Sequence, residues 1–119
     1  MNDYTAVIQH DSSISVCLYI ETEKLLAIGE KMEAICPDAY MNGYNWEAFL
    51  NCYLAQNAPD VLEEMGSDPE AGMYAAFYPH TPENEARAEK FASILRSLVE
   101  NEEAIYQFLR EHSDEIEWD

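Results

Sequence analysis

The residues of this chain that could serve as nucleophiles, bases or metal ligands are three histidines and three cysteines, spread along 119 residues. They are His10, His80, His112, Cys17, Cys36 and Cys52. Patterns such as H-E-x-x-H and C-x-x-C, which bring two such side chains onto one helix face or one turn, do not occur in the sequence. We therefore predict exposed loop histidines and buried free thiols, with no metal, no cofactor and no disulfide framework.

Acidic residues are abundant, but their spacing does not favour catalysis. Adjacent carboxylates such as Glu102 and Glu103 point in different directions on a helix, so they do not form a coupled acid pair. The four glycines are scattered, and no phosphate-binding loop is indicated. The chain is predicted not to be an enzyme. One alternative stays open: a small hydrolase or thiol enzyme in which Cys17 meets His80, or Cys52 meets another histidine, in space.

The formal net charge is -18, from 24 acidic and 6 basic residues, and two thirds of it falls on residues 60–119. Nucleic acids and anionic membranes bind proteins through lysine and arginine, so both are poor partners for this chain. Self-repulsion on this scale weakens the folded state; the charge therefore serves solubility or matches a basic protein partner. Residues 1–9 lack the features of a secretory signal, and no segment could span a membrane, so we predict a cytoplasmic protein.

Alternating apolar residues predict a β-hairpin at the start of the chain. Its strands are expected at Tyr4–Gln9 and Ile14–Ile20, separated by a polar turn. In the second strand the even-numbered residues are all aliphatic and share one face, while the odd-numbered residues share the other. This alternation is typical of a sheet that is covered on one side only.

Two helices are expected next. Thr22 can cap the first, which ends before Pro37. For the second, Gly43 suits a turn, Asn45 can accept free amide protons of a first helical turn, and apolar residues recur at helical spacing from Trp46 onward. We therefore expect this helix to begin at Trp46. The Trp46 ring lies at the edge of the apolar face, where it could close the core or stand out as an anchor for a partner.

The second half begins with a short helical turn that Pro59 opens and Gly66 closes. An uncharged stretch rich in aromatic residues, Gly72–Tyr78, is then expected to form a third strand. We assign its odd-numbered residues to the inward side. That assignment leaves its two tyrosines, Tyr74 and Tyr78, facing outward.

Two further helices complete the chain. Thr81, followed by Pro82, marks the start of one, and Asn101 can cap the other. The acidic tail, residues 113–119, is expected to fray, although Trp118 is unusual in a purely solvated segment.

These elements predict an α+β fold in the order β-β-α-α-β-α-α. A small antiparallel sheet of about three strands is packed on one face by four or five helices. No linker, repeat or low-complexity segment divides the chain, so residues 1–119 are expected to form a single domain. With 48% apolar residues, the chain can build a core of its own.

If the hairpin and the third strand share one sheet, four tyrosines can lie together on its open face. They are Tyr4, Tyr19, Tyr74 and Tyr78. Aromatic rings on a sheet can stack on RNA bases, but that use needs a basic surface, which this chain lacks. Two interpretations remain: a protein-binding face, to which tyrosine brings contact area and a hydroxyl group, or ordinary strand tyrosines half covered by loops.

Two sequence blocks resemble a known family. Residues 42–48, NGYNWEA, and residues 68–74, DPEAGMY, are similar in order and spacing to blocks of bacterial immunity proteins from polymorphic-toxin systems. Residues 16–19 also resemble the amino-terminal part of that family, so the resemblance covers most of the chain. It implies an intracellular protein, made beside a secreted or contact-delivered toxin, that binds the toxin and protects the producing cell. The resemblance implies no enzymatic activity.

The resulting hypothesis is an immunity protein that occludes a cognate toxin through complementary charge, a basic nuclease-type toxin being one option. Glutamates at helix starts and neighbouring aromatic residues are the expected contacts with this protein partner. They are Tyr44, Trp46, Glu47, Tyr74, Tyr78, Glu83, Glu85, Glu102 and Glu103. The chain is expected to act as a monomer or weak homodimer. The alternative is an acidic interaction module or homodimeric adaptor that uses the tyrosine face and involves no toxin.

Overall fold

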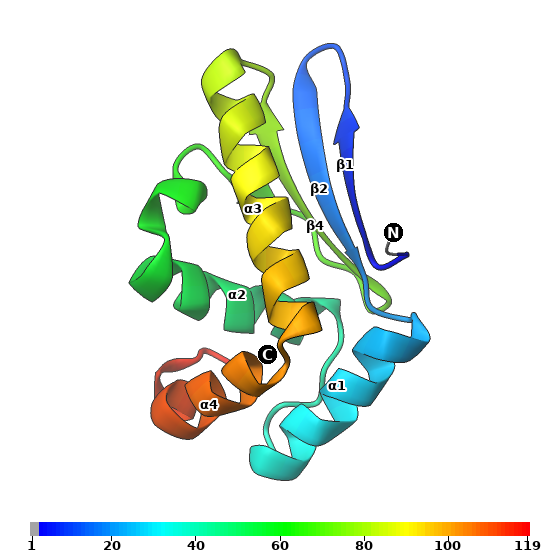
Figure 1. Ribbon diagram of the computed structural model, residues 1–119, viewed down its shortest axis with the longest axis vertical. Helices are drawn as coiled ribbons and strands as arrows, with labels where there is room; N and C mark the ends of the chain where they lie inside the picture. Colours follow the sequence, from blue (N-terminus) through cyan, green and yellow to red (C-terminus); the bar gives the residue numbers. More distant parts are fainter. Residues whose placement is uncertain (1–2) are drawn as a thin grey trace.

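The computed structural model describes residues 3–119, and its sheet begins with the hairpin expected from the sequence (Figure 1). β1 (Thr5–Gln9) and β2 (Ser13–Tyr19) are antiparallel. In the turn that joins them, the backbone amide of His10 donates to the carbonyl of Ser13 at 2.8 Å. The three aliphatic side chains on one side of β2 have no exposed surface, so this side of the hairpin faces the core.

The sheet has four antiparallel strands rather than about three, in the order β1-β2-β4-β3. β4 (Met73–Pro79) pairs with β2 along its whole length, and β3 (Gly66–Ser67) pairs with the other edge of β4. The expectation that Gly66 closes the preceding helical turn is therefore wrong. That turn, η1 (Pro59–Leu62), ends earlier, and Glu64 takes a left-handed φ of 62° before the chain enters β3.

The two faces of β4 are the reverse of the prediction. Tyr74 and Tyr78 point inward and have no exposed surface, whereas Phe77 on the opposite face is 44% exposed. The strand register explains this orientation. Tyr74 lies opposite Leu18, and Tyr78 lies opposite Ile14, so both tyrosines share the buried face of β2. Both sides of β4 carry apolar residues, so alternation within this strand alone does not distinguish them.

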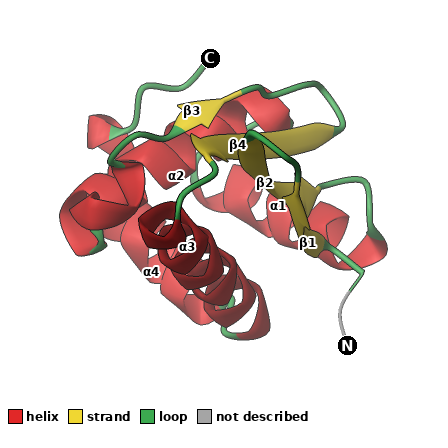
Figure 2. Cartoon of the chain, turned by 90° about the horizontal axis from the view of Figure 1, so that it is seen from above, coloured by secondary structure: helices red, strands yellow, loops and turns green. Residues whose placement is uncertain are grey.

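The helix α3 (Pro82–Glu100) crosses β1, β2 and β4 and covers their inner face (Figures 1 and 2). Thr81 caps it as predicted, because the hydroxyl oxygen of Thr81 accepts from the amide of Asn84 at 3.1 Å. Charged side chains recur along the outer side of α3. Within residues 3–119, no helix combines the length and the apolar character that a membrane crossing requires.

The remaining helices gather on the α3 side of the sheet and at one end of it (Figures 1 and 2). α1 (Glu23–Ile35) ends just before Pro37, as the sequence predicts. α4 (Glu103–His112) starts without the predicted cap, since the amide of Asn101 closes the end of α3 instead. The α+β class and the order of the predicted elements are confirmed, with β3 as the addition.

The helix α2 (Gly43–Asn57) begins three residues before the predicted start at residue 46. Its cap is Asn42, whose side-chain oxygen accepts from the amide of Asn45 at 2.9 Å. Asn45 is buried and joins two other segments to α2, the loop just before the helix and the C-terminal tail. Its side-chain amide donates to the carbonyl of Tyr40, and its side-chain oxygen accepts from the amide of Asp119. The side chain predicted to cap the helix is therefore used for tertiary structure.

The two blocks that carry the family resemblance lie against each other. The amide of Gly43, in the first block, donates to the carbonyl of Ala71, in the second, at 3.2 Å. A Cβ on residue 43 would collide with the carbonyl oxygens of Glu70 and Met73. Only glycine permits this approach, so at this contact the blocks serve the fold.

Trp46 closes the core, with 2% of its surface exposed. Its ring meets Phe49 edge to face, with centroids 5.8 Å apart, and Phe49 meets Phe108 of α4 in the same manner at 5.6 Å. These rings join α2 to α4. Of the two roles open to Trp46, the structure supports the structural one.

The tail does not fray. After α4 it forms a short turn, η2 (Ser113–Glu115), and its last residues return to α2. Ile116 is buried, and the half-buried Trp118 packs against the core. Burial of these two apolar side chains favours an ordered position for the acidic tail and opposes the conformational entropy that ordering removes.

Candidate partner-binding surface

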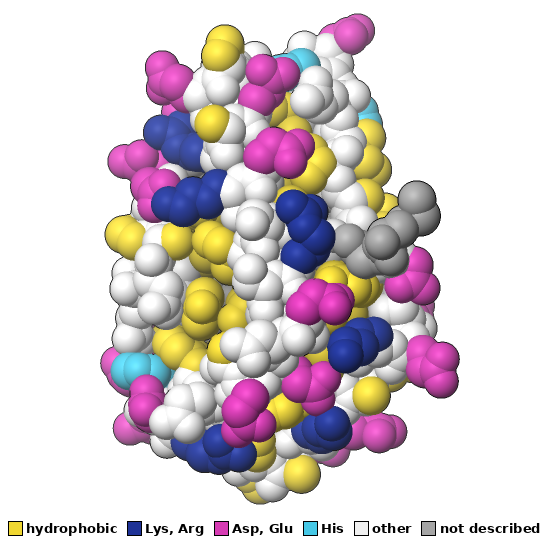
Figure 3. Space-filling model, in the orientation of Figure 1, with side chains coloured by type: hydrophobic (Ala, Val, Ile, Leu, Met, Phe, Trp, Pro, Cys, Tyr) yellow, Lys and Arg dark blue, Asp and Glu magenta, His cyan; other side chains and the backbone are white. Residues whose placement is uncertain are grey.

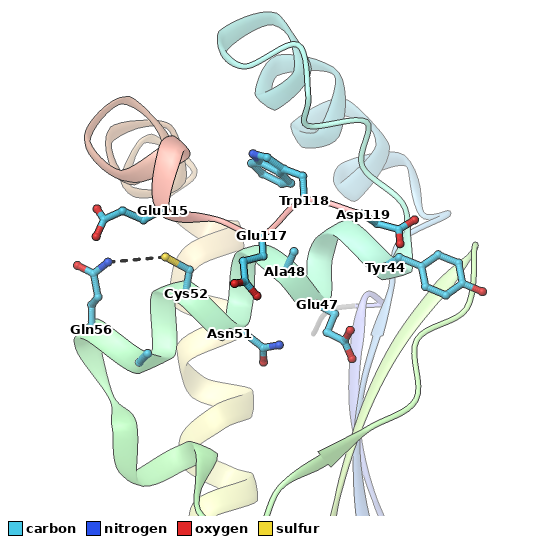
Figure 4. Close-up of a pocket in the computed structure, with 11 residues that line it drawn as sticks. Tyr44, Glu47, Ala48, Asn51, Cys52, Gln56, Glu115, Glu117, Trp118 and Asp119 are labelled. Carbon is cyan, nitrogen blue, oxygen red and sulfur yellow. Dashed lines mark hydrogen bonds between the residues drawn. The ribbon is translucent and has the colours of Figure 1, made fainter.

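A groove with a volume of about 560 Å³ runs along the outer side of α2, and the C-terminal tail forms one of its walls (Figure 4). Its lining residues are Tyr44, Glu47, Ala48, Asn51, Cys52, Ala55, Gln56, Glu115, Glu117, Trp118 and Asp119. In Figure 4 the carboxylates of Glu47 and Glu117 lie along the same side of α2, and the ring of Tyr44 projects at one end.

The groove follows from the residues on the outer side of α2. Ala48, Cys52 and Ala55 are small, so the helix leaves room between itself and the tail. The amide of Asp119 donates to the buried side chain of Asn45 at 2.7 Å, which fixes the end of the tail wall. This contact joins residues 74 positions apart, and local sequence patterns do not reveal it.

Carboxylates dominate the charge of the groove. Four of its lining residues are acidic: Glu47, Glu115, Glu117 and Asp119. Within residues 3–119, no lysine or arginine lines it. His112 beside the groove bonds the Glu115 carboxylate through Nδ1 at 2.5 Å, and the side-chain nitrogen of Gln56 lies 3.5 Å from the same ring nitrogen. The groove thus presents a negative potential to solvent.

The basic residues of the chain lie elsewhere. All six are on α1, α3 or α4: Lys24, Lys31, Arg87, Lys90, Arg96 and Arg110. Figure 3 shows them interspersed with acidic side chains on the helix side of the molecule. Five form ion pairs there with acidic residues, at 2.8 to 3.3 Å. These pairs neutralise five acidic residues on this side, whereas no lysine or arginine among the described residues lines the groove.

The structure brings two of the predicted contact residues into the groove. Tyr44 is 42% exposed at its end. Glu47 is half-buried, and its carboxylate accepts a hydrogen bond from the hydroxyl of Ser67 in β3. Both side chains are positioned by the first turns of α2, which the buried Trp46 fixes to the core.

Three predicted contact residues are not accessible to a partner. Trp46, Tyr74 and Tyr78 are all buried, so the expectation that the β4 tyrosines form an outward face is wrong. The hydroxyl of Tyr78 donates to the carbonyl of Val61 at 2.7 Å, while the buried hydroxyl of Tyr74 has no hydrogen-bond partner. A third member of the proposed face, Tyr4, is also buried, and the fourth, Tyr19, is half-buried. A homodimer through a tyrosine face therefore lacks its surface.

Glu83 and Glu85 lie at the start of α3 and do not line the groove. Glu83 is exposed. Glu85 bonds the Nε2 atom of His80 at 3.1 Å. This carboxylate, together with the carbonyl of His10, raises the pKa of His80 above its ordinary value. The pair tethers the turn before α3 to its first helical turn.

Glu102 and Glu103 lie where α3 meets α4, outside the groove as well. The carboxylate of Glu102 accepts from Lys31 at 2.8 Å, from Tyr106 at 3.0 Å and from Lys24 at 3.3 Å. These donors lower the pKa of Glu102 to about 2. Glu103 pairs with the cation of α4, Arg110. Glu102 therefore connects α1 to α4, a role within the fold.

Most residues of the groove were not predicted. The tail residues were missed because the tail was expected to fray, although Trp118 was the signal against that expectation. The outer residues of α2, such as Asn51 and Ala55, carry no distinctive pattern. Their relevance depends on the tail that lies beside them.

The two cysteines considered as nucleophiles, Cys17 and Cys52, lie in settings that disfavour the thiolate. Burial raises the pKa of the Cys17 and Cys52 thiols, which reduces the thiolate fraction. Cys52 accepts a weak hydrogen bond from Gln56 at 3.7 Å, and the same amide group separates it from His112. In the part of the chain that the structure describes, no three His, Cys, Asp or Glu residues are placed to hold a metal ion.

The family model described as immunity protein 51 matches residues 5–114. No curated protein and no solved structure matches the chain. The match spans both sequence blocks and the fold from β1 to α4, and it ends before the tail residues that line the groove, which are 115 and 117–119.

Proposed function

This chain belongs to the immunity protein 51 family, and we propose that it binds and neutralises a cognate toxin through its acidic groove. The toxin is proposed to carry a basic surface, as a nuclease-type toxin does, and to be blocked by occlusion of that surface. The proposed unit is the whole chain, residues 1–119, acting as one domain in the cytoplasm. It acts by binding rather than by catalysis, as a monomer or weak homodimer, and it uses neither nucleic acid nor membrane as a partner.

The observation that carries this proposal is the set of four carboxylates that line the groove with no lysine or arginine among its described lining residues, Glu115 alone being bonded to a histidine, His112. Like charges held close together repel each other and lower the stability of the folded state. A function in binding would explain why the chain keeps them. On the helix side, five acids of the same chain are paired with lysine or arginine. A basic partner would supply the missing positive charge in the groove.

Complementary charge would act mainly on the rate of encounter. Long-range attraction can raise association rates by about 10- to 1000-fold, and the gain falls as salt screens the charges. A nuclease-type toxin binds phosphates with lysine and arginine, and carboxylates can occupy the same cationic surface. The groove would then cover the surface on which the toxin binds its substrate.

The test uses the toxin domain encoded beside this chain's gene, inactivated in its own active site, and surface plasmon resonance at low and high salt. The groove variant carries Glu47→Gln, Glu117→Gln and Asp119→Asn. The control variant carries Glu63→Gln, Glu64→Gln and Glu103→Gln, which remove the same charge from acids that are paired with arginine. We expect the groove variant to lower the association rate about tenfold and to flatten its salt dependence. The control should change both much less.

Equal effects of the two variants would mean that net charge, and not the groove, guides the toxin. An unchanged association rate in the groove variant would remove the groove from the interface while leaving the immunity role in place. If the unmodified chain fails to bind the toxin domain at any salt concentration, the proposed neutralisation is wrong for this toxin.

A further inference from the structure

Phe77 is an aromatic side chain that the fold leaves outside its core. It lies on the face of β4 opposite to the buried tyrosines and is 44% exposed. The helices lie on the other side of the sheet, so none of them covers it (Figure 2). One exposed phenylalanine is ordinary on a protein surface, so its meaning depends on the residues around it.

The neighbouring strand provides a flat support for this ring. Gly66 of β3 lies opposite Phe77 in the register. A Cβ on residue 66 would come within 2.5 Å of the ring atoms Cε2 and Cζ, so the ring lies directly over the glycine. The φ of Gly66 is not positive, and the backbone does not require glycine there. Because residue 66 has no side chain, the Phe77 ring can lie directly against the backbone of β3.

The same strand joins Phe77 to the acidic groove. Ser67, the residue after Gly66, donates its hydroxyl hydrogen to the carboxylate of Glu47 on the groove. The two residues of β3 thus contact an exposed aromatic ring, through Gly66, and a carboxylate of the groove, through Ser67. Interfaces of high affinity commonly place an aromatic anchor beside a charged rim in this way.

We propose that Phe77, seated on Gly66, is the apolar anchor of the toxin interface, which continues from the groove across β3 onto the outer face of the sheet. This inference rests on the proposed function. The partner it requires is a protein with an apolar pocket next to a basic surface. A second copy of this chain is a poorer occupant, because two molecules with a net charge of -18 repel each other around the patch.

The outer face of the sheet supplies a matched control. Ile8 is 40% exposed on β1, at the opposite edge of the sheet from β3. Its position in the register, opposite Ser15, places it on the same outer face as Phe77, which also lies opposite Ser15. An interface that continues from the groove across β3 reaches Phe77 first and has no need of Ile8.

The experiment measures binding of the inactivated toxin domain to Phe77→Ala, Gly66→Ala and Ile8→Ala, with thermal unfolding of each variant as a check on folding. We expect Phe77→Ala to raise the Kd by about 30-fold or more, mainly through faster dissociation, at low and high salt alike. Gly66→Ala keeps the ring but displaces it, and should raise the Kd by a smaller factor. Ile8→Ala should leave the Kd unchanged.

A Kd for Phe77→Ala equal to that of the unmodified chain would overturn the anchor while leaving toxin binding intact. Equal losses in Phe77→Ala and Ile8→Ala would also overturn it, because the whole sheet face would then be the interface. If sedimentation shows that the unmodified chain forms a dimer that Phe77→Ala dissociates, with toxin binding unaffected, the face serves a second copy instead. Failure of the unmodified chain to bind would count against the proposed function itself.

Discussion

The α1–α4 junction and the α2 groove are built from the same kinds of side chain in opposite settings. At the junction, Glu102 has two lysines and a tyrosine hydroxyl as donors. In the groove, Glu117 and Asp119 face other carboxylates and no lysine or arginine among the described residues. An acid with its cation inside the molecule stabilises the fold, while an acid without one is available to a partner. Residue type alone does not separate these roles.

The largest change in stability is expected when two aromatic residues of α2 are compared. Trp46→Ala removes a buried ring and should lower the free energy of unfolding by about 3–5 kcal/mol. Tyr44→Ala, two residues earlier and 42% exposed, should lower it by about 0.5 kcal/mol or less. Urea denaturation measures both. Similar losses in the two variants would mean that Tyr44 belongs to the core and not to the groove.

The second test concerns the paired acid and its pH dependence. Glu102→Gln should lower the free energy of unfolding by about 1–2 kcal/mol, whereas Glu117→Gln should leave it unchanged. Because the folded protein holds the Glu102 pKa at about 2, below its ordinary 4.5, this contribution is present above pH 4.5 and is lost as pH falls through about 2. Unfolding curves at several pH values should therefore converge for Glu102→Gln and the unmodified chain in acid. Curves that stay parallel down to pH 2 would contradict this assignment.

A smaller effect distinguishes the two buried tyrosines of β4. Tyr78→Phe removes the donor to the Val61 carbonyl and should lower the free energy of unfolding by about 1 kcal/mol. Tyr74→Phe removes a buried hydroxyl that has no partner, so it should leave stability unchanged or raise it by up to about 1 kcal/mol. Chemical denaturation of the two single variants gives the comparison. A loss in Tyr74→Phe as large as in Tyr78→Phe would show that the Tyr74 hydroxyl is hydrogen-bonded.

The smallest expected effect has the opposite sign. Neutralising Glu47, Glu117 and Asp119 together should raise the free energy of unfolding by about 0.5 kcal/mol at low salt, because repulsion within the groove is relieved. The gain should disappear at high salt, where these exposed charges are screened. Because the side-chain oxygen of a glutamine at residue 47 can still accept from Ser67, a loss of stability at low salt would mean that the groove acids have cationic partners inside the molecule.

Several features of this protein follow from local sequence. Alternation predicts the hairpin, Thr81 and Pro82 predict the start of α3, and Pro37 predicts the end of α1. These signals depend on a few neighbouring residues, so the chain carries them before it folds. The α+β class and the family resemblance rest on the same information.

Tertiary structure decided which faces and segments are exposed. Both sides of β4 are apolar, and only its register with β2 places Tyr74 and Tyr78 inside and Phe77 outside. The composition of the tail predicts a solvated segment. In the structure, Ile116, Trp118 and a hydrogen bond to a residue 74 positions away hold the tail against α2, and the groove lies between them. A binding surface is the part of a chain that internal packing leaves unsatisfied, and long-range contacts determine what remains.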